Sequence, residues 1–180
     1  MRLCDAWSRV LLSVRNYDFS SIRVLIVDRN AFMRRVLRSI LRTFSVGAIL
    51  DERHMETAWD TLQSTQPDMV FLDWSPSFNG LAMLKRIRND KGSMNLFVPV
   101  IITSSLTEPD SVIEARDAGM TTFIARPFSP KLVYDRMCTV IEYPRAYVRS
   151  DDFFGPDRRH RNIAVENDRR KGDPEAEDKK

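Results

Sequence analysis

Four polar side chains that could handle a phosphoryl group each follow a short apolar run of the sequence. Two are carboxylates, one is a hydroxyl and one is a guanidinium: Asp28, Asp73, Ser104 and Arg126. A carboxylate can be the nucleophile that accepts a phosphoryl group, and a second carboxylate can hold a Mg²⁺ ion. A hydroxyl and a cation can stabilise the product. The residue types therefore predict phosphoryl transfer to an aspartate, provided that the four side chains meet in one pocket.

The hydrophobic pattern predicts elements that would bring these residues together. Strand-sized apolar runs alternate with helical patterns, which is typical of a parallel sheet covered on both faces. We expect strands at 22–27, 47–50, 69–72, 99–103 and 122–125, and helices at 33–44, 55–62, 80–89, 110–118 and 130–141. Because ligands of open parallel sheets bind beyond the carboxyl ends of the strands, the four polar residues should line one pocket.

The ends and faces of the helices can also be predicted. In the first helix, apolar residues recur at a spacing of three and four, so Arg34, Arg35, Arg38 and Arg42 are expected to face away from the core. Ser129 is expected to cap the last helix, with Pro130 at its first position.

Four segments carry a resemblance to a known family. They read VLIVDRN, MVFLDW, PVIITSS and FIARPF, and in this order and spacing they resemble the CheY-like response-regulator receiver domain. The resemblance implies an α/β, flavodoxin-like, doubly wound five-stranded parallel sheet of order 2-1-3-4-5 with five helices. It also implies that Asp73 accepts phosphate from a histidine kinase or a phosphotransfer protein. By the same resemblance, Ser104 would be the switch hydroxyl, Phe123 the gating aromatic, and Arg126 would stand in place of the family's lysine, before a proline that follows a cis peptide bond.

The sequence departs from the family at the expected metal site. By resemblance the Mg²⁺ ligands would be Asp28, Asp73 and the backbone of Ser75, but Arg29 stands where the family usually has a second acidic residue. The loop after Asp73 is one residue shorter than usual, which puts ligation by Ser75 in doubt. Arg29 either points into the pocket and pairs with a carboxylate or lies on the surface. In both cases weak Mg²⁺ binding is expected.

Composition divides the chain into three parts. Residues 1–20 are an N-terminal extension, 21–143 the receiver domain, and 144–180 a basic tail whose glycines, prolines and charges predict disorder. Residues 1–16 are compatible with a short amphipathic helix or a loosely held extension, and the second interpretation is preferred. In the tail, FFGPDRRHR places two aromatic residues before Arg158, Arg159 and Arg161, a composition suited to a ligand with phosphates and bases. This is similar to the arginine-rich tails of CheY-like cyclic di-GMP effectors, although charged tails are usually only solvated.

The composition also limits the class of protein. Its two distant cysteines, Cys4 and Cys138, do not suit a disulfide framework or a zinc site, and no apolar run is long enough to span a membrane. A net charge of +3 does not call for a nucleic-acid partner, and the tail is too short and polar for a DNA-binding domain. We therefore expect a cytoplasmic, non-enzymatic, single-domain response regulator of a two-component phosphorelay that signals through a protein partner. The alternative is a degenerate receiver that binds a nucleotide such as cyclic di-GMP through its arginine-rich tail.

Overall fold

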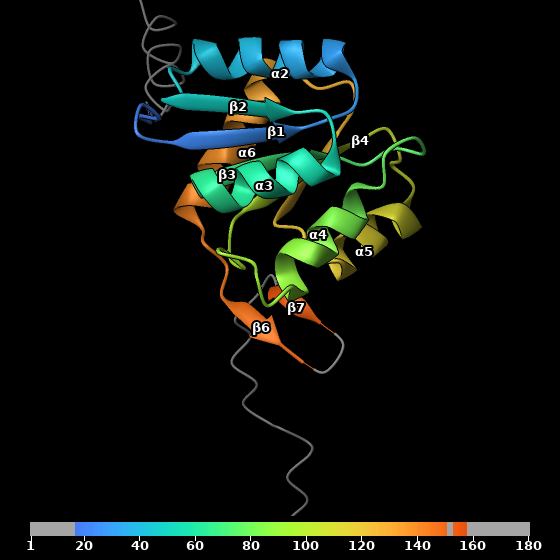
Figure 1. Ribbon diagram of the computed structural model, residues 1–180. Helices are drawn as coiled ribbons and strands as arrows, with labels where there is room; N and C mark the ends of the chain where they lie inside the picture. Colours follow the sequence, from blue (N-terminus) through green and yellow to red (C-terminus); the bar gives the residue numbers. More distant parts are fainter. Residues whose placement is uncertain (1–16, 151–152, 158–180) are drawn as a thin grey trace, which may run out of the picture.

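The computed structural model describes residues 17–150 and 153–157. At its centre lies a sheet of five parallel strands in the order β2-β1-β3-β4-β5 (Figure 1). The strands are β1 (Arg23–Val27), β2 (Ala48–Glu52), β3 (Met69–Asp73), β4 (Val100–Ser104) and β5 (Thr122–Ala125). This order confirms the predicted flavodoxin-like sheet.

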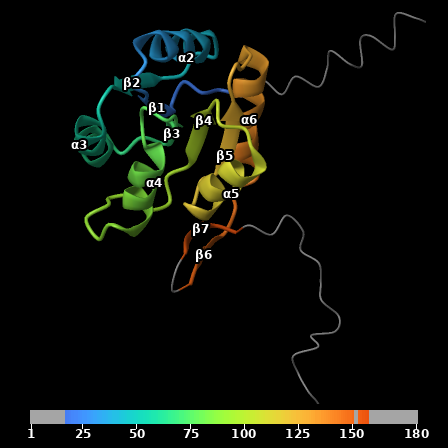
Figure 2. The same cartoon turned by 90° about the vertical axis from the view of Figure 1, so that its right-hand side faces the viewer.

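Five helices connect and follow these strands, as the sequence predicted. They are α2 (Ala31–Thr43), α3 (Met55–Thr65), α4 (Gly80–Asn89), α5 (Pro109–Asp117) and α6 (Pro130–Glu142). Helices α2 and α6 cover one face of the sheet and α3, α4 and α5 cover the other (Figures 1 and 2). Ser129 caps α6 as predicted, because its hydroxyl accepts a hydrogen bond from the backbone N–H of Leu132 at 3.2 Å.

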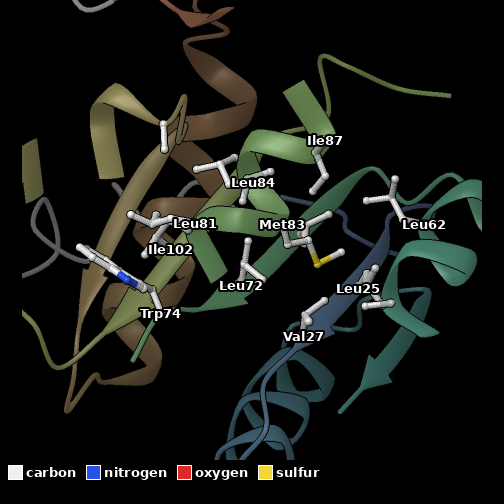
Figure 3. Packing of buried hydrophobic residues seen from close by; sticks show 14 of the residues in the cluster. Leu25, Val27, Leu62, Leu72, Trp74, Leu81, Met83, Leu84, Ile87 and Ile102 are labelled. Carbon is white, nitrogen blue, oxygen red and sulfur yellow. The ribbon is translucent and has the colours of Figure 1, made fainter. Parts of the chain in front are cut away.

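The core lies in two layers because successive side chains of a strand point to opposite faces of the sheet. On the side of α4, Leu84 and Ile87 pack toward Leu72 and Ile102 of the sheet (Figure 3). On the other side, Leu41 of α2 and Met137 of α6 belong to a second buried cluster with Ile26, Phe71 and Ile101 of the strands. Strands β3 and β4 are buried along their whole length, as expected for a parallel sheet covered twice.

The packed domain begins before the predicted boundary at residue 21. Phe19, which was assigned to the N-terminal extension, is only 1% exposed and packs with the α2 and α6 cluster. Its ring meets Tyr134 edge-on, with centroids 5.8 Å apart. Residues 1–16, with their predicted amphipathic segment, lie outside the described residues.

The predicted disorder after residue 143 is wrong for the described part of that segment. Strands β6 (Tyr147–Arg149) and β7 (Phe154–Pro156) form an antiparallel hairpin that lies beside the ends of α4 and α5 (Figures 1 and 2). The rings of Tyr147 and Phe154 pack against Phe97 at centroid distances of 5.1 and 5.5 Å. The aromatic residues of this segment thus bury enough apolar surface to order it, which the composition of the whole tail concealed.

The hairpin covers a fully buried arginine at the amino-terminal edge of the sheet. Arg88 of α4 is 0% exposed and donates hydrogen bonds to the carbonyl oxygens of Gly119 at 3.0 Å and Leu96 at 2.7 Å. Its guanidinium lies 5.3 Å from the ring centroid of Tyr147. Since Leu96 and Gly119 precede β4 and β5, the hairpin lies at the end of the sheet opposite to Asp73.

No helix in the described part of the chain is both long and apolar enough to cross a membrane.

Candidate functional site

A cluster of buried polar side chains, called the pocket below, lies where β1, β3, β4 and β5 end, on the sheet face that α2 and α6 cover. The strand register places Asp73 directly beside Thr103, and Val27 beside Leu72. Because side chains alternate between faces, Asp28, one residue after Val27, points to the same side as Asp73 and Thr103. Asp28 and Asp73 are each only 3% exposed.

Arg126 connects these residues. Its Nη2 atom lies 2.6 Å from Oδ2 of Asp28 and donates to the Thr103 hydroxyl at 2.7 Å. Its Nη1 atom lies 3.0 Å from Oδ1 of Asp73. The structure thus brings three of the four predicted residues together, and the peptide bond between Arg126 and Pro127 is cis, as predicted. Thr103 was not among the predicted residues, although its position next to Asp73 in the register could have suggested it.

Burial dominates the ionisation of the Asp73 carboxyl. Loss of solvent raises its pKa from its ordinary value near 4 to about 6, although Arg126 acts in the opposite direction. The negative charge of Asp28 raises this pKa further, and a hydrogen bond from Ser75 lowers it. At neutral pH the carboxylate form therefore predominates, which is the form that can attack phosphorus.

The Ser104 side chain makes its hydrogen bonds away from Asp73 and from the guanidinium of Arg126. It comes one residue after Thr103 on β4, so its side chain points to the opposite face of the sheet. Its buried hydroxyl donates to the carbonyl oxygen of Trp74 at 2.5 Å and accepts from the backbone N–H of Leu106 at 2.9 Å. The structure therefore places Ser104 beneath the loop that follows Asp73, and its role as a switch hydroxyl stays a prediction.

The loop between β3 and α4 is held close to Asp73. The Ser75 hydroxyl donates to Oδ2 of Asp73 at 3.0 Å, and Ser75 and Phe78 exchange backbone hydrogen bonds of 3.1 and 2.9 Å. Gly80 begins α4 against the carbonyl oxygen of Asp73, where an added Cβ would lie only 2.0 Å from that oxygen. Glycine is therefore required for this close approach.

Asp28 also shapes the turn that leads into α2. Its Oδ1 accepts a hydrogen bond from the backbone N–H of Asn30 at 2.7 Å, so it is a turn residue as well as a member of the pocket. Arg34 holds the same turn, donating to the Asp28 carbonyl oxygen at 2.7 Å and to Asp51 at 3.0 Å. Arg34 and Arg38, predicted to face away from the core, are instead half-buried and pair with Asp51. The sequence signal for this contact was the acidic residue near the end of β2.

Arg29 was predicted either to point into the pocket or to lie on the surface, and the structure places it on the surface. Its side chain is exposed, and Nη1 donates to the carbonyl oxygen of Ser77 at 3.3 Å. Among the described residues no ion pair joins Arg29 to a pocket carboxylate. The cation beside Asp28 and Asp73 is Arg126.

The donor set does not fit a divalent metal ion. Both carboxylates already face the guanidinium of Arg126, and the carbonyl oxygen of Ser75 accepts a backbone hydrogen bond from Phe78. In the described part of the chain, no three acidic, histidine or cysteine side chains gather in a way that could hold a metal. Weak Mg²⁺ binding was predicted because of Arg29, and it stays a prediction. The cation that the structure places beside both carboxylates is Arg126.

Two further predicted roles concern aromatic and basic residues. Phe123 is half-buried and packs against the cluster of α3, α4 and α5, so a packing role is clear and a gating role stays a prediction. Phe154, proposed to grip a flat ligand together with the tail arginines, is instead buried against Phe97 and Tyr147. Arg158, Arg159 and Arg161 lie outside the described residues.

The fold and the pocket together define an open α/β protein with a buried, cation-paired aspartate at the carboxyl edge of its central strand. The family model of the response regulator receiver domain matches residues 24–137. This chain belongs to the response regulator receiver family.

Its relatives include chemotaxis proteins of the same size as the domain. The chain is 28% identical over 122 residues to chemotaxis protein CheY1 of Helicobacter pylori, covering 67% of this chain and 97% of that protein. It is 29% identical over 122 residues to a CheY homologue of Campylobacter jejuni, covering 67% and 92%. Among solved structures, Vibrio cholerae CheY4 superposes with a TM-score of 0.59 at 21% identity, covering 66% of this chain and 98% of that one. A putative response regulator from Chloroflexus aurantiacus gives 0.60 at 21% identity, covering 67% and 98%. These two structures support the fold alone.

Proposed function

We propose that this protein is a cytoplasmic response regulator in which Asp73 accepts a phosphoryl group from a histidine kinase or a phosphotransfer protein. The observation that carries the proposal is the position of Asp73. It ends the central strand of the sheet, buried beside a second carboxylate and bridged to it by Arg126. We propose a phosphoryl acceptor rather than an enzyme with a separate substrate, because the described residues of the pocket supply a nucleophile and a compensating cation.

The chemistry is an in-line displacement at phosphorus. One carboxylate oxygen of Asp73 attacks, the bond between phosphorus and the donor's nitrogen or oxygen breaks, and the donor group leaves with that electron pair. Oδ2 is the candidate nucleophile, because the group that hydrogen-bonds to it is the neutral Ser75 hydroxyl, whereas Oδ1 faces the positive charge of Arg126. Arg126 then lies where the phosphoryl charge arrives, and a guanidinium stabilises such charge through several N–H donors.

A second protein would receive the signal, and one surface supports this part of the proposal. A groove of about 300 Å³ lies between α5, β5 and α6. Met120 and Phe123 form part of its apolar lining, and Arg116, Arg136 and Arg145 line it as well. Such a groove suits a partner segment that carries acidic groups beside apolar side chains. Among the described residues, this is the surface we assign to output.

Mass spectrometry of the intact full-length protein tests phosphoryl acceptance. The protein is incubated with acetyl phosphate, an acyl phosphate donor, and in parallel with phosphoramidate, whose P–N bond resembles that of phosphohistidine. We expect one phosphoryl increment in the natural protein and in Asp60→Asn, which removes an exposed carboxylate of α3. Asp73→Asn should show none.

Folding of each variant is checked by circular dichroism. A folded natural protein that gains no phosphoryl group from either donor, or an Asp73→Asn variant that gains one as readily, would overturn the proposal.

A further inference from the structure

One guanidinium joins two buried carboxylates that would otherwise repel each other. Arg126 reaches Asp28 Oδ2 through Nη2 at 2.6 Å and Asp73 Oδ1 through Nη1 at 3.0 Å. All three are largely removed from solvent, with exposed fractions of the side chain alone of 16% for Arg126, 5% for Asp28 and 3% for Asp73. Burying two like charges side by side is costly unless a cation lies between them, and Arg126 is that cation.

The positive charge that Arg126 places between the carboxylates is permanent. A guanidinium stays protonated at every pH at which a protein is folded. A positive charge therefore always lies beside the two carboxylates. A third donor contact, from Nη2 to the Thr103 hydroxyl at 2.7 Å, fixes the orientation of the guanidinium plane. The guanidinium is thus held at once by residues at the ends of β1, β3 and β4.

A divalent ion would have to compete with this arrangement. Mg²⁺ requires oxygen ligands at about 2.0–2.1 Å in near-octahedral geometry, and one oxygen of each carboxylate already lies beside the guanidinium of Arg126. Placing the ion there would bring a second cation next to the guanidinium.

The guanidinium also keeps an unused donor in the pocket. The Nε atom of Arg126 is buried and has no hydrogen-bond partner among the described residues. A buried donor without an acceptor is costly, and an oxygen of an incoming phosphoryl group could accept its hydrogen bond. The same side chain that pairs the carboxylates could therefore also hold the product.

We infer that Arg126 takes the place of the divalent cation in this pocket. The protein does not take up Mg²⁺ at Asp28 and Asp73, and phosphoryl transfer to Asp73 proceeds without it. The second half of this inference rests on the proposed function. In the step itself, an Asp73 oxygen forms the new bond to phosphorus, the bond to the phosphohistidine nitrogen or acyl oxygen breaks, and Arg126 supplies the compensating positive charge.

Isothermal titration calorimetry with MgCl₂ tests the first half without any phosphoryl chemistry. We expect the full-length natural protein to give no binding heat at Mg²⁺ concentrations up to about 10 mM, because its carboxylates already face Arg126. Arg126→Met, which leaves Asp28 and Asp73 without their cation, should gain a Mg²⁺-dependent binding heat. It should also gain a Mg²⁺-dependent rise in its thermal unfolding midpoint. Arg29→Met is the matched control, because it removes a nearby surface cation and should behave like the natural protein.

Two results would overturn the inference. One is Mg²⁺ binding by the natural protein that disappears in Asp28→Asn. The other is a folded Arg126→Met variant that still gives no Mg²⁺ binding, since Arg126 would then not be what excludes the ion.

Phosphorylation in EDTA and in excess Mg²⁺ tests the second half. We expect equal phosphoryl incorporation in the two conditions. Incorporation only with Mg²⁺ would overturn the metal-independent mechanism while leaving the proposed function intact. Absence of incorporation in both conditions would instead count against the proposed function, and the calorimetry would still decide whether Arg126 excludes the metal.

Discussion

The Nη1 atom of Arg126 lies 3.0 Å from Oδ1 of Asp73, and the same guanidinium lies 2.6 Å from Asp28 through Nη2. This pairing links the last strand of the sheet to its first and third strands. It also sets the electrostatics of the pocket, because no other cation among the described residues pairs with either carboxylate. The predictions below follow from it and from the packing around it.

Removing the charge of Arg126 should raise the pKa of Asp73. In the natural protein burial raises this pKa to about 6 and Arg126 holds it below the value that burial and Asp28 alone would give. In Arg126→Gln we expect a further rise of about one pKa unit, since a nearby arginine typically lowers the pKa of an aspartate by 1–3 units. Titration of the Asp73 side-chain carbon by ¹³C NMR measures this directly. Arg29→Gln should leave the titration unchanged, and an equal rise in both variants would contradict the assignment to Arg126.

The raised pKa of Asp73 should also make the free energy of unfolding depend on pH. A folded-state pKa of about 6, above the unfolded value near 4, means that the folded protein binds more protons between these pH values. Stability is therefore lost as the pH rises from about 4 to about 6, and the full cost is present at neutral pH. Asp73→Asn removes this cost and should be more stable by about 1–2 kcal/mol at pH 7, after allowance for solvent screening at the pocket mouth.

Urea unfolding of the two proteins at several pH values measures that difference. It should shrink toward zero well below pH 4, where the Asp73 carboxyl is protonated in both states. A difference that stays constant or grows toward acidic pH would show that the sign is wrong.

Gly80→Ala should disturb the pocket through the backbone. The new Cβ would lie 2.0 Å from the Asp73 carbonyl oxygen, so α4 or the end of β3 must move. We expect a loss of about 2–4 kcal/mol in the free energy of unfolding, in the range of severe steric substitutions, together with slower phosphorylation of Asp73. Gly92→Ala is the control, since its nearest neighbour is a side-chain oxygen of Asp90 at 3.3 Å. Equal unfolding free energies for the two variants would exclude a special role for Gly80.

The hairpin of β6 and β7 should contribute measurably to stability. Phe154 is buried against Phe97 and Tyr147, whereas Val148 on the same hairpin is 39% exposed. Phe154→Ala should therefore cost about 2–4 kcal/mol, toward the lower end of the range for buried aromatic residues, and Val148→Ala about 0.5 kcal/mol or less. Urea unfolding of both full-length variants measures these values. If Phe154→Ala unfolds like the natural protein, the hairpin is not part of the cooperative domain.

The fold could be predicted from the sequence because its signals are local and periodic. The alternation of apolar runs and helical stripes placed all five parallel strands and their helices to within a few residues. The cap at Ser129 also followed from residue type and position. For the site, the rule that parallel strands end at a common edge was enough to bring Asp28, Asp73 and Arg126 into one pocket.

The tertiary structure decided which side chains meet. Contact depends on strand register and on which of several candidate side chains packs against a given partner. One residue of register separates Thr103, which binds Arg126, from Ser104, which points to the other face. In the sequence, Arg29 and Arg126 both stand just after the end of a strand, so either could have paired with the carboxylates. Only packing determined that Arg126 does so while Arg29 lies at the surface. The hairpin after residue 143 was hidden for the same reason. Its few aromatic residues find their partners Phe97 and Arg88 only once the sheet has formed.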